Sequence, residues 1–434
     1  MTLANPVTLR KTLLPMPTSA QAPAVPRLTY LRIKNYRALR DVEFRDLTPL
    51  TVLIGPNGSG KSTVLDALDF LAEAVRGNLV GAWEKRERFR GMQTRDSGEW
   101  VIEFEAEIQL DTSKPRLLYK LVIDEADGVV FVSDESLTEV EPNGKRIFFL
   151  DNAEPNELRN HGYENDFRLN IYSHDTAKGY STSLSSTPLV ARSGFFPEQM
   201  GKDWPSALAI VKFFQPFRRV VFTDKHLKGF SDRGPQERLS ADGENLPNLL
   251  YYYHREHSEV LQKITTLIQQ RVPSLAEIQM EKTSDDRLLL RFKDSPFKTP
   301  FPARFTSGGT VKLTALFALL YEPDAEGLLA IEEPENELHP QLLYRLTEEF
   351  DKAAEKRQLF VTTHSPLLLD ALDPQQVWVI YRGEDGYTRV KRTADMPNVP
   401  ELAEDGSMLG YLWTSNTFTE GDPQAPFKAS PDAR

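Results

Sequence analysis

The sequence predicts an α/β protein built from a parallel-sheet core, an antiparallel β lobe and a helical insertion. Three observations predict this class. First, a short apolar run ends in a glycine-rich loop at 55–63, and a helical pattern follows. Second, apolar and polar residues alternate through 100–134, which is typical of half-buried antiparallel strands. Third, helical patterns and short apolar runs take turns from 301 onward, which is typical of a parallel sheet.

The composition limits the class of protein. The 434 residues predict two or three structural units, and 40% hydrophobic residues are enough for a large core. The absence of cysteine excludes disulfides, thiolate zinc sites and a thiol nucleophile. A net charge of −11 disfavours attraction of the whole surface to nucleic acid, although it leaves a local basic groove open.

The first part of the chain predicts an arm and a lobe. Residues 1–26 contain several prolines and lack a continuous apolar segment, so we expect a flexible N-terminal arm rather than a signal peptide. Residues 27–150 predict an N-terminal lobe with two or three strands, the glycine-rich loop, a helix and an antiparallel meander. The segment 151–235 predicts a loop-rich insertion, because 151–202 is rich in Asn, Ser, Thr, Gly and Pro.

The rest of the chain returns to regular patterns. Residues 236–300 predict one long helix from Asn245 followed by two strands, and 301–395 predict a C-terminal lobe. Residues 396–434 predict a last helix and a polar tail. An apolar run of about 18 residues is missing from the whole sequence, so we expect no membrane-spanning helix and a cytoplasmic location.

The segment GPNGSGKST matches the pattern G-x-x-x-x-G-K-[ST] of phosphate-binding loops. Its glycines let backbone N–H groups turn toward one point, and the start of the following helix adds a positive dipole end. We expect Lys61 to reach the β- and γ-phosphates and Ser62 to bind Mg²⁺. The predicted nucleotide-binding residues of this loop are Gly55, Pro56, Asn57, Gly58, Ser59, Gly60, Lys61, Ser62 and Thr63.

Three later motifs add candidate residues. The apolar run LLAI ends in Glu332 and Glu333, which suit magnesium binding and polarisation of an attacking water. The alternative for this pair is a solvated strand end. The run VTTHSP places a single His364 after another strand, and its alternative is a capping or core histidine. The segment TSGGT opens a helix and predicts either a second anion site or a simple turn.

The order of these motifs resembles that of ABC-type ATPases, in the branch that includes SMC, RecF and OLD-family ATPases. The sequence looks most like compact AAA-type ATPases of bacteria, many of which belong to anti-phage defence operons. The resemblance covers roughly 28–110 and 236–415. It implies an ABC-type ATPase head with ATP and Mg²⁺ as cofactors, and it leaves the segment 151–202 unexplained.

The resemblance also implies roles for single residues. Residues 55–63 match Walker A, with Lys61 as a catalytic residue, and the signature motif matches Ser307, Gly308 and Gly309. Glu332 takes the Walker B magnesium position, Glu333 that of the catalytic base, and His364 that of the switch histidine at the γ-phosphate. Two positions depart from the usual pattern: Glu332 stands where Asp is common, and Thr310 follows the signature.

Three further residues enter through the same resemblance. Asn35 and Arg37 belong to a segment that lies near the nucleotide in the family. Gln93 stands where a Q-loop glutamine contacts the metal, although its spacing from Walker A is loose.

The resemblance implies a partner of the same kind. In such ATPases the signature helix of one subunit covers the nucleotide of another, so ATP closes a dimer or a higher homo-oligomer and hydrolysis opens it. The sequence after His364 lacks the spaced acidic residues of an OLD-type nuclease domain. We therefore expect a separate effector or nuclease chain, and the leading hypothesis is a sensor or regulator of anti-phage defence.

A DNA-binding repair ATPase of the SMC/RecF kind is the alternative, with nucleic acid as a further candidate partner. Its support is a run of basic residues around Phe89, in which Glu84 and Glu87 interleave and favour a solvated charged face instead. The basic residues are Lys85, Arg86, Arg88, Arg90 and Arg95. A transporter ATPase is disfavoured, because the chain is longer than a bare nucleotide-binding subunit.

Overall fold

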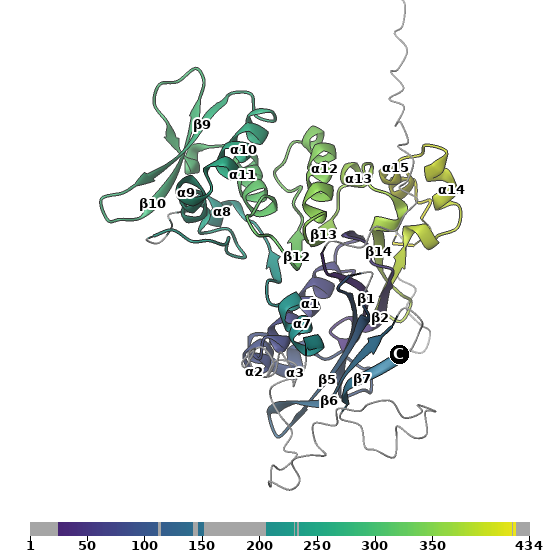
Figure 1. Cartoon of the computed structure of the whole chain (residues 1–434). Helices are drawn as coiled ribbons and strands as arrows, with labels where there is room; N and C mark the ends of the chain where they lie inside the picture. Colours follow the sequence, from purple (N-terminus) through teal and green to yellow (C-terminus); the bar gives the residue numbers. More distant parts are fainter. Residues whose placement is uncertain are drawn as a thin grey trace, which may run out of the picture.

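The computed structural model describes residues 25–111, 114–141, 146–151, 205–229, 231, 234–418 and 420–421 (Figure 1). The predicted arm at 1–26 therefore lies almost wholly outside the described residues, and so does most of the predicted insertion. Within the described part, no helix combines the length and hydrophobicity needed to cross a membrane.

The N-terminal lobe is an antiparallel sheet, as the alternating pattern predicts. Its strand order is β2-β1-β4-β5-β6-β7, and each neighbouring pair is antiparallel. On β4 the residues Ile102, Phe104 and Ala106 are buried, while the residues between them are partly exposed. The strands are β1 (Arg27–Tyr36), β2 (Leu39–Arg45), β4 (Ile102–Gln109), β5 (Arg116–Ala126), β6 (Val129–Val140) and β7 (Arg146–Asp151).

A second six-stranded sheet forms the core, with the order β15-β14-β3-β13-β12-β8. All neighbouring pairs are parallel except β14 and β15. Every residue of β3 and β13 is buried, because helices and the other sheet cover both faces. The strands are β3 (Leu50–Ile54), β8 (Arg218–Val220), β12 (Leu328–Glu332), β13 (Gln358–Thr363), β14 (Val377–Arg382) and β15 (Thr388–Arg392).

The core sheet separates two hydrophobic cores. On β3, Leu53 faces one core, whereas Val52 and Ile54 face the other. The first core also holds the antiparallel sheet with α1 (Lys61–Val75) and α7 (Pro205–Phe214). The helices α2 (Leu79–Lys85) and α3 (Arg88–Met92) follow α1 along the chain, whereas α8 (Asp224–Leu227) contributes Leu227 to the second core.

The second core packs the C-terminal helices against the opposite face of the sheet. The helix α11 (Gly308–Leu320) is buried from Thr310 to its end, which fits its apolar sequence. The other α-helices are α12 (Leu343–Ala354), α13 (Pro366–Leu369), α14 (Val399–Glu404) and α15 (Leu409–Thr414). Short 3₁₀ turns are η1 (Ala303–Phe305), η2 (Pro340–Leu342), η3 (Pro374–Gln376) and η4 (Thr393–Asp395).

The helical insertion forms the teal and green projection in Figure 1. It contains a three-stranded sheet of β9 (Leu275–Lys282), β10 (Leu288–Asp294) and β11 (Phe301–Pro302). The single long helix predicted from Asn245 is wrong. It is two helices, α9 (Leu246–Glu256) and α10 (Ser258–Gln269), because His257 leaves the helical backbone and bonds through its ring to Tyr252. The last helix predicted after 396 is likewise two, α14 and α15.

The predicted boundary at 235 is also wrong. The segment 151–235 was expected to be loop-rich, but α7, β8 and α8 lie in its second half. Strand β8 pairs in parallel with β12 and forms one edge of the core sheet. Three residues are too few for a periodic pattern, so the sequence alone does not reveal this strand.

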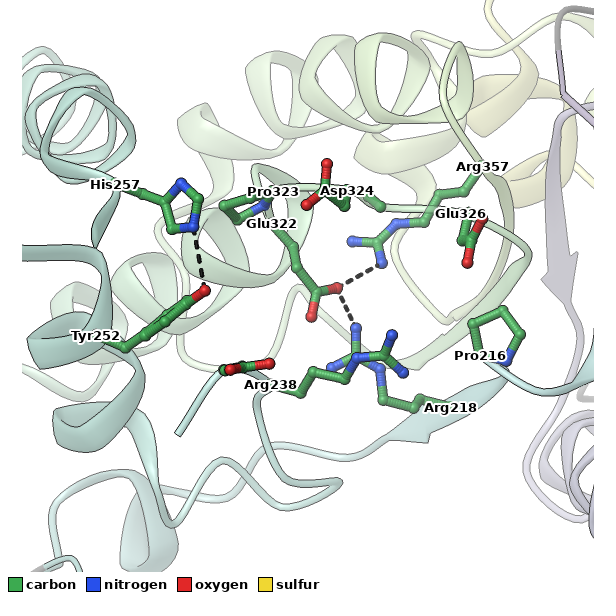
Figure 2. A pocket seen from close by; sticks show the side chains of 12 residues that line it. Pro216, Arg218, Arg238, Tyr252, His257, Glu322, Pro323, Asp324, Glu326 and Arg357 are labelled. Atoms are coloured by element: carbon green, nitrogen blue, oxygen red, sulfur yellow. Dashed lines mark hydrogen bonds and ion pairs between the residues drawn. The ribbon is translucent and has the colours of Figure 1, made fainter. Parts of the chain in front are cut away.

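A polar cavity of about 110 Å³ lies at the amino ends of the core strands (Figure 2). Arg218 opens β8, Arg357 directly precedes β13, and both donate to the buried carboxylate of Glu322. Burial lowers the pKa of Arg357 to about 10. A buried charge without a partner is costly, so each of these three residues needs the others. The cluster therefore links three segments of the chain.

Candidate active site

The predicted phosphate loop, the two carboxylates and the histidine meet at one edge of the core sheet. The parallel register pairs Thr363 with Ile54 and Glu332 with Thr362. The residues that follow each strand therefore lie at the same edge, since these are the carboxyl ends of neighbouring parallel strands. This edge carries the loop 55–63 after β3, the two carboxylates after β12 and His364 after β13.

The loop depends on glycine at two positions. A Cβ atom at Gly55 would lie 1.9 Å from the carbonyl oxygen of Ile380. Gly60 has a φ of 115°, and a Cβ atom there would lie 2.6 Å from Thr388 Oγ1. Any side chain at either position would displace the loop from its neighbours.

The hairpin β14–β15 supports the loop from the side. Thr388 Oγ1 donates to the carbonyl oxygen of Ser59 at 2.7 Å, and Arg382 Nε donates to that of Gly58 at 2.8 Å. Sequence reasoning missed both residues. The sequence carries no signal for these two contacts, because they join segments more than 300 residues apart and neither residue belongs to a motif.

Lys61 is folded back onto its own loop. Its Nζ donates to the carbonyl oxygens of Gly55 at 2.8 Å and Pro56 at 3.1 Å, and the residue is buried. Burial lowers the pKa of Lys61 to about 8, and the nearby carboxylates of Glu333 and Glu335 oppose that shift. The ammonium group of Lys61 therefore lies at the phosphate loop, close to the carboxylates of Glu333 and Glu335.

Ser62 and Glu332 meet directly, as the magnesium prediction requires. Ser62 Oγ donates to Glu332 Oε2 at 2.7 Å. Ser62 is the second residue of α1, the helix that follows the loop, and Glu332 is the last residue of β12. A hydroxyl and a carboxylate oxygen form a donor set that suits Mg²⁺, so the residues present fit that ion.

Glu333 is held by two side chains. Its Oε1 lies 3.2 Å from His364 Nε2, and its Oε2 accepts from Asn336 Nδ2 at 2.8 Å. Its backbone has a φ of 43°, and its N–H donates to the carbonyl oxygen of Thr362 at 3.0 Å. The strained turn points the carboxylate toward the histidine, away from the path of the strand.

His364 faces this carboxylate as a neutral ring. Burial lowers its pKa, and the charge of Lys61 lowers it further, while Glu333 and Glu335 oppose the shift. A neutral imidazole that donates from Nε2 to Glu333 fits the measured separation. Glu335 fixes the histidine: its Oε1 accepts from His364 N at 2.8 Å and from Thr363 Oγ1 at 2.6 Å.

The helix start at 307–309 touches the turn that carries Glu333. A Cβ atom at Gly308 would lie 2.2 Å from Glu337 Oε2, and one at Gly309 would lie 2.7 Å from the carbonyl oxygen of Glu337. Lys312 Nζ donates to the carbonyl oxygen of Glu333 at 3.2 Å. Ser307 is exposed. The two glycines therefore permit close packing inside the chain, and Lys312 is a link that the sequence did not suggest.

Asn35 is not brought to the loop. Its side chain is fully buried, and Nδ2 donates to the carbonyl oxygens of Glu99 at 3.0 Å and Val101 at 2.7 Å. Its Oδ1 accepts from Ser97 Oγ at 2.8 Å. The amide is thus used within the lobe, and the expectation of a nucleotide contact does not fit this geometry.

Gln93 is engaged in the same region. Its Nε2 donates to the carbonyl oxygen of Glu99 at 2.6 Å, and its backbone bridges to Tyr36. Across the residues that the structure describes, no hydrogen bond or ion pair joins it to Ser62 or Glu332. The amide of Gln93 thus holds the end of the 94–99 loop, and its expected metal contact stays a prediction.

Arg37 does lie beside the site, through one intermediate residue. Its Nη1 lies 2.8 Å from Asp66 Oδ2, and its Nε donates to the carbonyl oxygen of Gly91 at 3.0 Å. Asp66 lies one helical turn after Ser62 on α1. Sequence reasoning missed Asp66, which reads as an ordinary polar position of an amphipathic helix.

The basic run proposed for DNA contact is partly buried. The Arg86 side chain is only 2% exposed and pairs with Asp66, Asp69 and Glu73. Lys85 pairs with Glu73 at 2.9 Å, and Phe89 is buried. The four exposed members are Lys85, Arg88, Arg90 and Arg95. One residue of the expected patch, Arg86, is therefore internal, and carboxylates of α1 neutralise Arg86 and pair with Lys85.

A phosphate loop, two strand-end carboxylates and a histidine on adjacent parallel strands define an ATPase of the ABC type, in the branch with SMC and OLD-like proteins. The chain belongs to the family described as "AAA domain, putative AbiEii toxin, Type IV TA system", whose family model matches residues 50–370. That range begins at β3 and ends with α13, so it includes the loop, the carboxylates, the helix start and His364.

The chain is also similar to one curated protein, the OLD nuclease of Thermus scotoductus. The two are 23% identical over 401 residues, which are 86% of this chain. The chain spans 66% of the length of that relative.

Among solved structures, the chain is similar to SMC head domains. One is an SMC head bound to the C-winged helix domain of ScpA, with 15% identity, a TM-score of 0.48 and coverage of 84% of this chain and 96% of that one. The SMC head from Thermotoga maritima has 13% identity, a TM-score of 0.39 and coverage of 84% and 98%. A head from Pyrococcus furiosus, bound to the C-terminal domain of ScpA, has 13% identity, a TM-score of 0.46 and coverage of 88% and 99%.

Proposed function

We propose that this chain binds ATP with Mg²⁺ and hydrolyses it to ADP and phosphate. The observation that carries the proposal is the meeting of Ser62 with Glu332 at 2.7 Å, beside the pair of Glu333 and His364 at 3.2 Å. These four residues come from a helix start and two strand ends around one phosphate loop. Family membership supports nucleotide binding by this loop.

The loop would bind the phosphates through its backbone and one ammonium group. The N–H groups at the start of α1 have no partners within the helix, so they are free to face an anion. Lys61 would exchange the carbonyl oxygens of Gly55 and Pro56 for phosphate oxygens. That exchange replaces two neutral acceptors with charged ones, which form stronger hydrogen bonds.

Glu333 would act on the attacking water. Ser62 and Glu332 would hold Mg²⁺, which when bound neutralises charge on the β- and γ-phosphates. Glu333 would take a proton from water at a carboxylate oxygen, while Asn336 and His364 fix the plane of that carboxylate. His364 also offers an Nε2–H group to phosphate oxygens once the nucleotide is present.

The catalytic unit would be a pair of chains. Ser307 is exposed at the start of α11, where the first N–H groups have no partners within the helix. In the described residues, no hydrogen bond or ion pair joins 307–309 to the loop 55–63 of the same chain. We therefore propose that this helix start covers the nucleotide of a second copy, in an ATP-dependent dimer or a higher homo-oligomer.

The nucleotide cycle would serve as a switch for another protein. Lys312 links the helix start to the backbone of Glu333, so nucleotide state and dimer contact would change together. We propose a sensor or regulator role in bacterial anti-phage defence, with a separate effector or nuclease chain. The similarity to an OLD nuclease and the family description of a toxin–antitoxin system support this setting.

A direct test is steady-state release of phosphate from ATP by the purified chain. We expect turnover that requires Mg²⁺, stops in EDTA and rises more than linearly with protein concentration, since two chains form each site. Turnover that is absent at every concentration, with ATP and Mg²⁺ in excess, would contradict the proposed function. Salt-dependent DNA binding in the same preparation would favour the alternative of a DNA-repair ATPase.

A further inference from the structure

Arg219, on strand β8, contacts two carboxylates beside the site. Its Nε pairs with Glu332 Oε1, and its Nη1 lies 3.1 Å from Asp66 Oδ1. The other oxygen of Glu332 accepts from Ser62, which lies one turn before Asp66 on α1. Glu332, Arg219, Asp66 and Ser62 thus form a closed ring across two strands and one helix.

The strand pairing explains why Arg219 reaches this place. In the parallel register Arg219 lies opposite Ala330, two residues before Glu332. Its neighbour Arg218 pairs with Glu322 at the amino ends of the strands. Adjacent arginines on one short strand therefore serve opposite ends of the core sheet, and only Arg219 reaches the site.

The ring is also anchored to the N-terminal lobe. Asp66 accepts from Tyr36 Oη at 2.6 Å and pairs with Arg37 at 2.8 Å, both at the end of β1. Asp66 is buried, so its position is fixed by several partners at once. Glu332 has Arg219 as its partner at Oε1 and Ser62 at Oε2. Without Arg219, the carboxylate of Glu332 would keep only its hydrogen bond from Ser62, and its side chain would be free to rotate.

We propose that Arg219 is a positioning residue that aims the carboxylate of Glu332 at Ser62 and so shapes the magnesium site. This inference rests on the proposed function, because it assigns Glu332 to the metal. The planar guanidinium suits the task, since two of its nitrogens hold two separate carboxylates in a fixed geometry. A lysine would supply the charge without that fork.

The experiment compares Arg219→Lys and Arg219→Gln with the wild-type chain. Binding of a fluorescent ATP analogue is titrated with Mg²⁺, and the same analogue is titrated in EDTA. We expect both variants to need about tenfold more Mg²⁺ for half-maximal enhancement of binding, the usual cost of losing a residue that orients a metal ligand. Affinity in EDTA should stay within about twofold, because the phosphate loop is untouched.

Arg218→Lys is the matched control, since it changes the adjacent arginine but not the ring. We expect its Mg²⁺ titration to match the wild type. Thermal unfolding of each variant, followed by circular dichroism, checks that it is folded. If Arg219→Gln does not fold, Arg219→Lys still tests the inference, because it keeps a cation between Asp66 and Glu332.

Three results would overturn the inference. Arg219→Lys that titrates like the wild type would show that charge alone matters. A lower Mg²⁺ requirement in Arg219→Gln would show that the arginine competes with the ion. Equal changes in affinity for the analogue with Mg²⁺ and in EDTA would show that Arg219 has a general structural role. Wild-type protein that binds no nucleotide would instead contradict the proposed function, and the inference would fall with it.

Discussion

His364 Nε2 lies 3.2 Å from Glu333 Oε1, although the two residues end different strands of the core sheet. Burial and the charge of Lys61 lower the pKa of His364, so the ring is neutral near pH 7 and donates to the carboxylate. This pair joins the candidate base to a side chain that directly follows β13.

His364→Ala should slow ATP hydrolysis far more than it weakens nucleotide binding. Removal of one donor aimed at developing charge costs about 10²–10³-fold in turnover. The measurement is turnover of saturating ATP together with affinity for the fluorescent analogue. His339→Ala is the matched control, because that histidine is exposed and its ring accepts from the nearby backbone N–H of Gln341. Equal turnover in the two variants would remove His364 from the mechanism.

Affinity for ATP should fall as the pH rises past about 8. Lys61 is cationic below its lowered pKa of about 8 and neutral above it, while bound phosphates would hold the proton on. Binding above that pKa therefore includes uptake of a proton, and affinity should fall about fivefold between about pH 8 and pH 9. Lys61→Arg keeps its charge and should show a flat profile. If the wild-type affinity for ATP did not change between these pH values, binding would not depend on the protonation of Lys61.

Glu322→Gln should destabilise the fold without touching the active site. The change leaves Arg218 and Arg357 without their shared carboxylate in the cavity of Figure 2. Removal of one partner of a buried ion cluster costs about 3–5 kcal/mol in the free energy of unfolding. Glu326→Gln, at the exposed rim, should change it by less than about 0.5 kcal/mol. Urea denaturation measures both, and equal midpoints would mean that the cluster is not stabilising.

Ser307→Arg should bind ATP as a single chain but lose ATPase activity. A bulky arginine at the exposed helix start would block its approach to a second copy. Lys61→Ala should lose nucleotide binding. Mixing the two variants damages one composite site twice and leaves the other intact, so partial activity should return if the chains exchange. Normal turnover by Ser307→Arg alone, as a monomer, would contradict the composite site.

Much of the architecture could be predicted from local patterns. The loop at 55–63, the strand ends at Glu332 and His364, and the antiparallel meander follow from motifs and periodicity that span a few residues. In the structure, Ser62 meets Glu332 and Glu333 meets His364. Their assigned roles stay predictions. The motif order was sufficient here because parallel strands bring their carboxyl ends together.

What the sequence could not predict depends on distant pairing. Strand β8 is three residues long, so neither it nor Arg219 carries a periodic signal. The buried Arg86 looked like part of a basic surface, since burial of a charge depends on acids brought near by folding. Asn35 was read as a ligand residue, yet its amide is used by a loop more than 60 residues away.

The measurement that tests the account most directly is the mass of Glu333→Gln in solution, with and without ATP and Mg²⁺, beside its rate of phosphate release. Glutamine keeps the shape of Glu333 and removes the base, which typically costs about 10²–10⁴-fold in rate. We predict a variant that binds ATP, hydrolyses it at that reduced rate and accumulates as a dimer only when ATP is present. Wild-type turnover, or a monomer with ATP bound, would contradict the account.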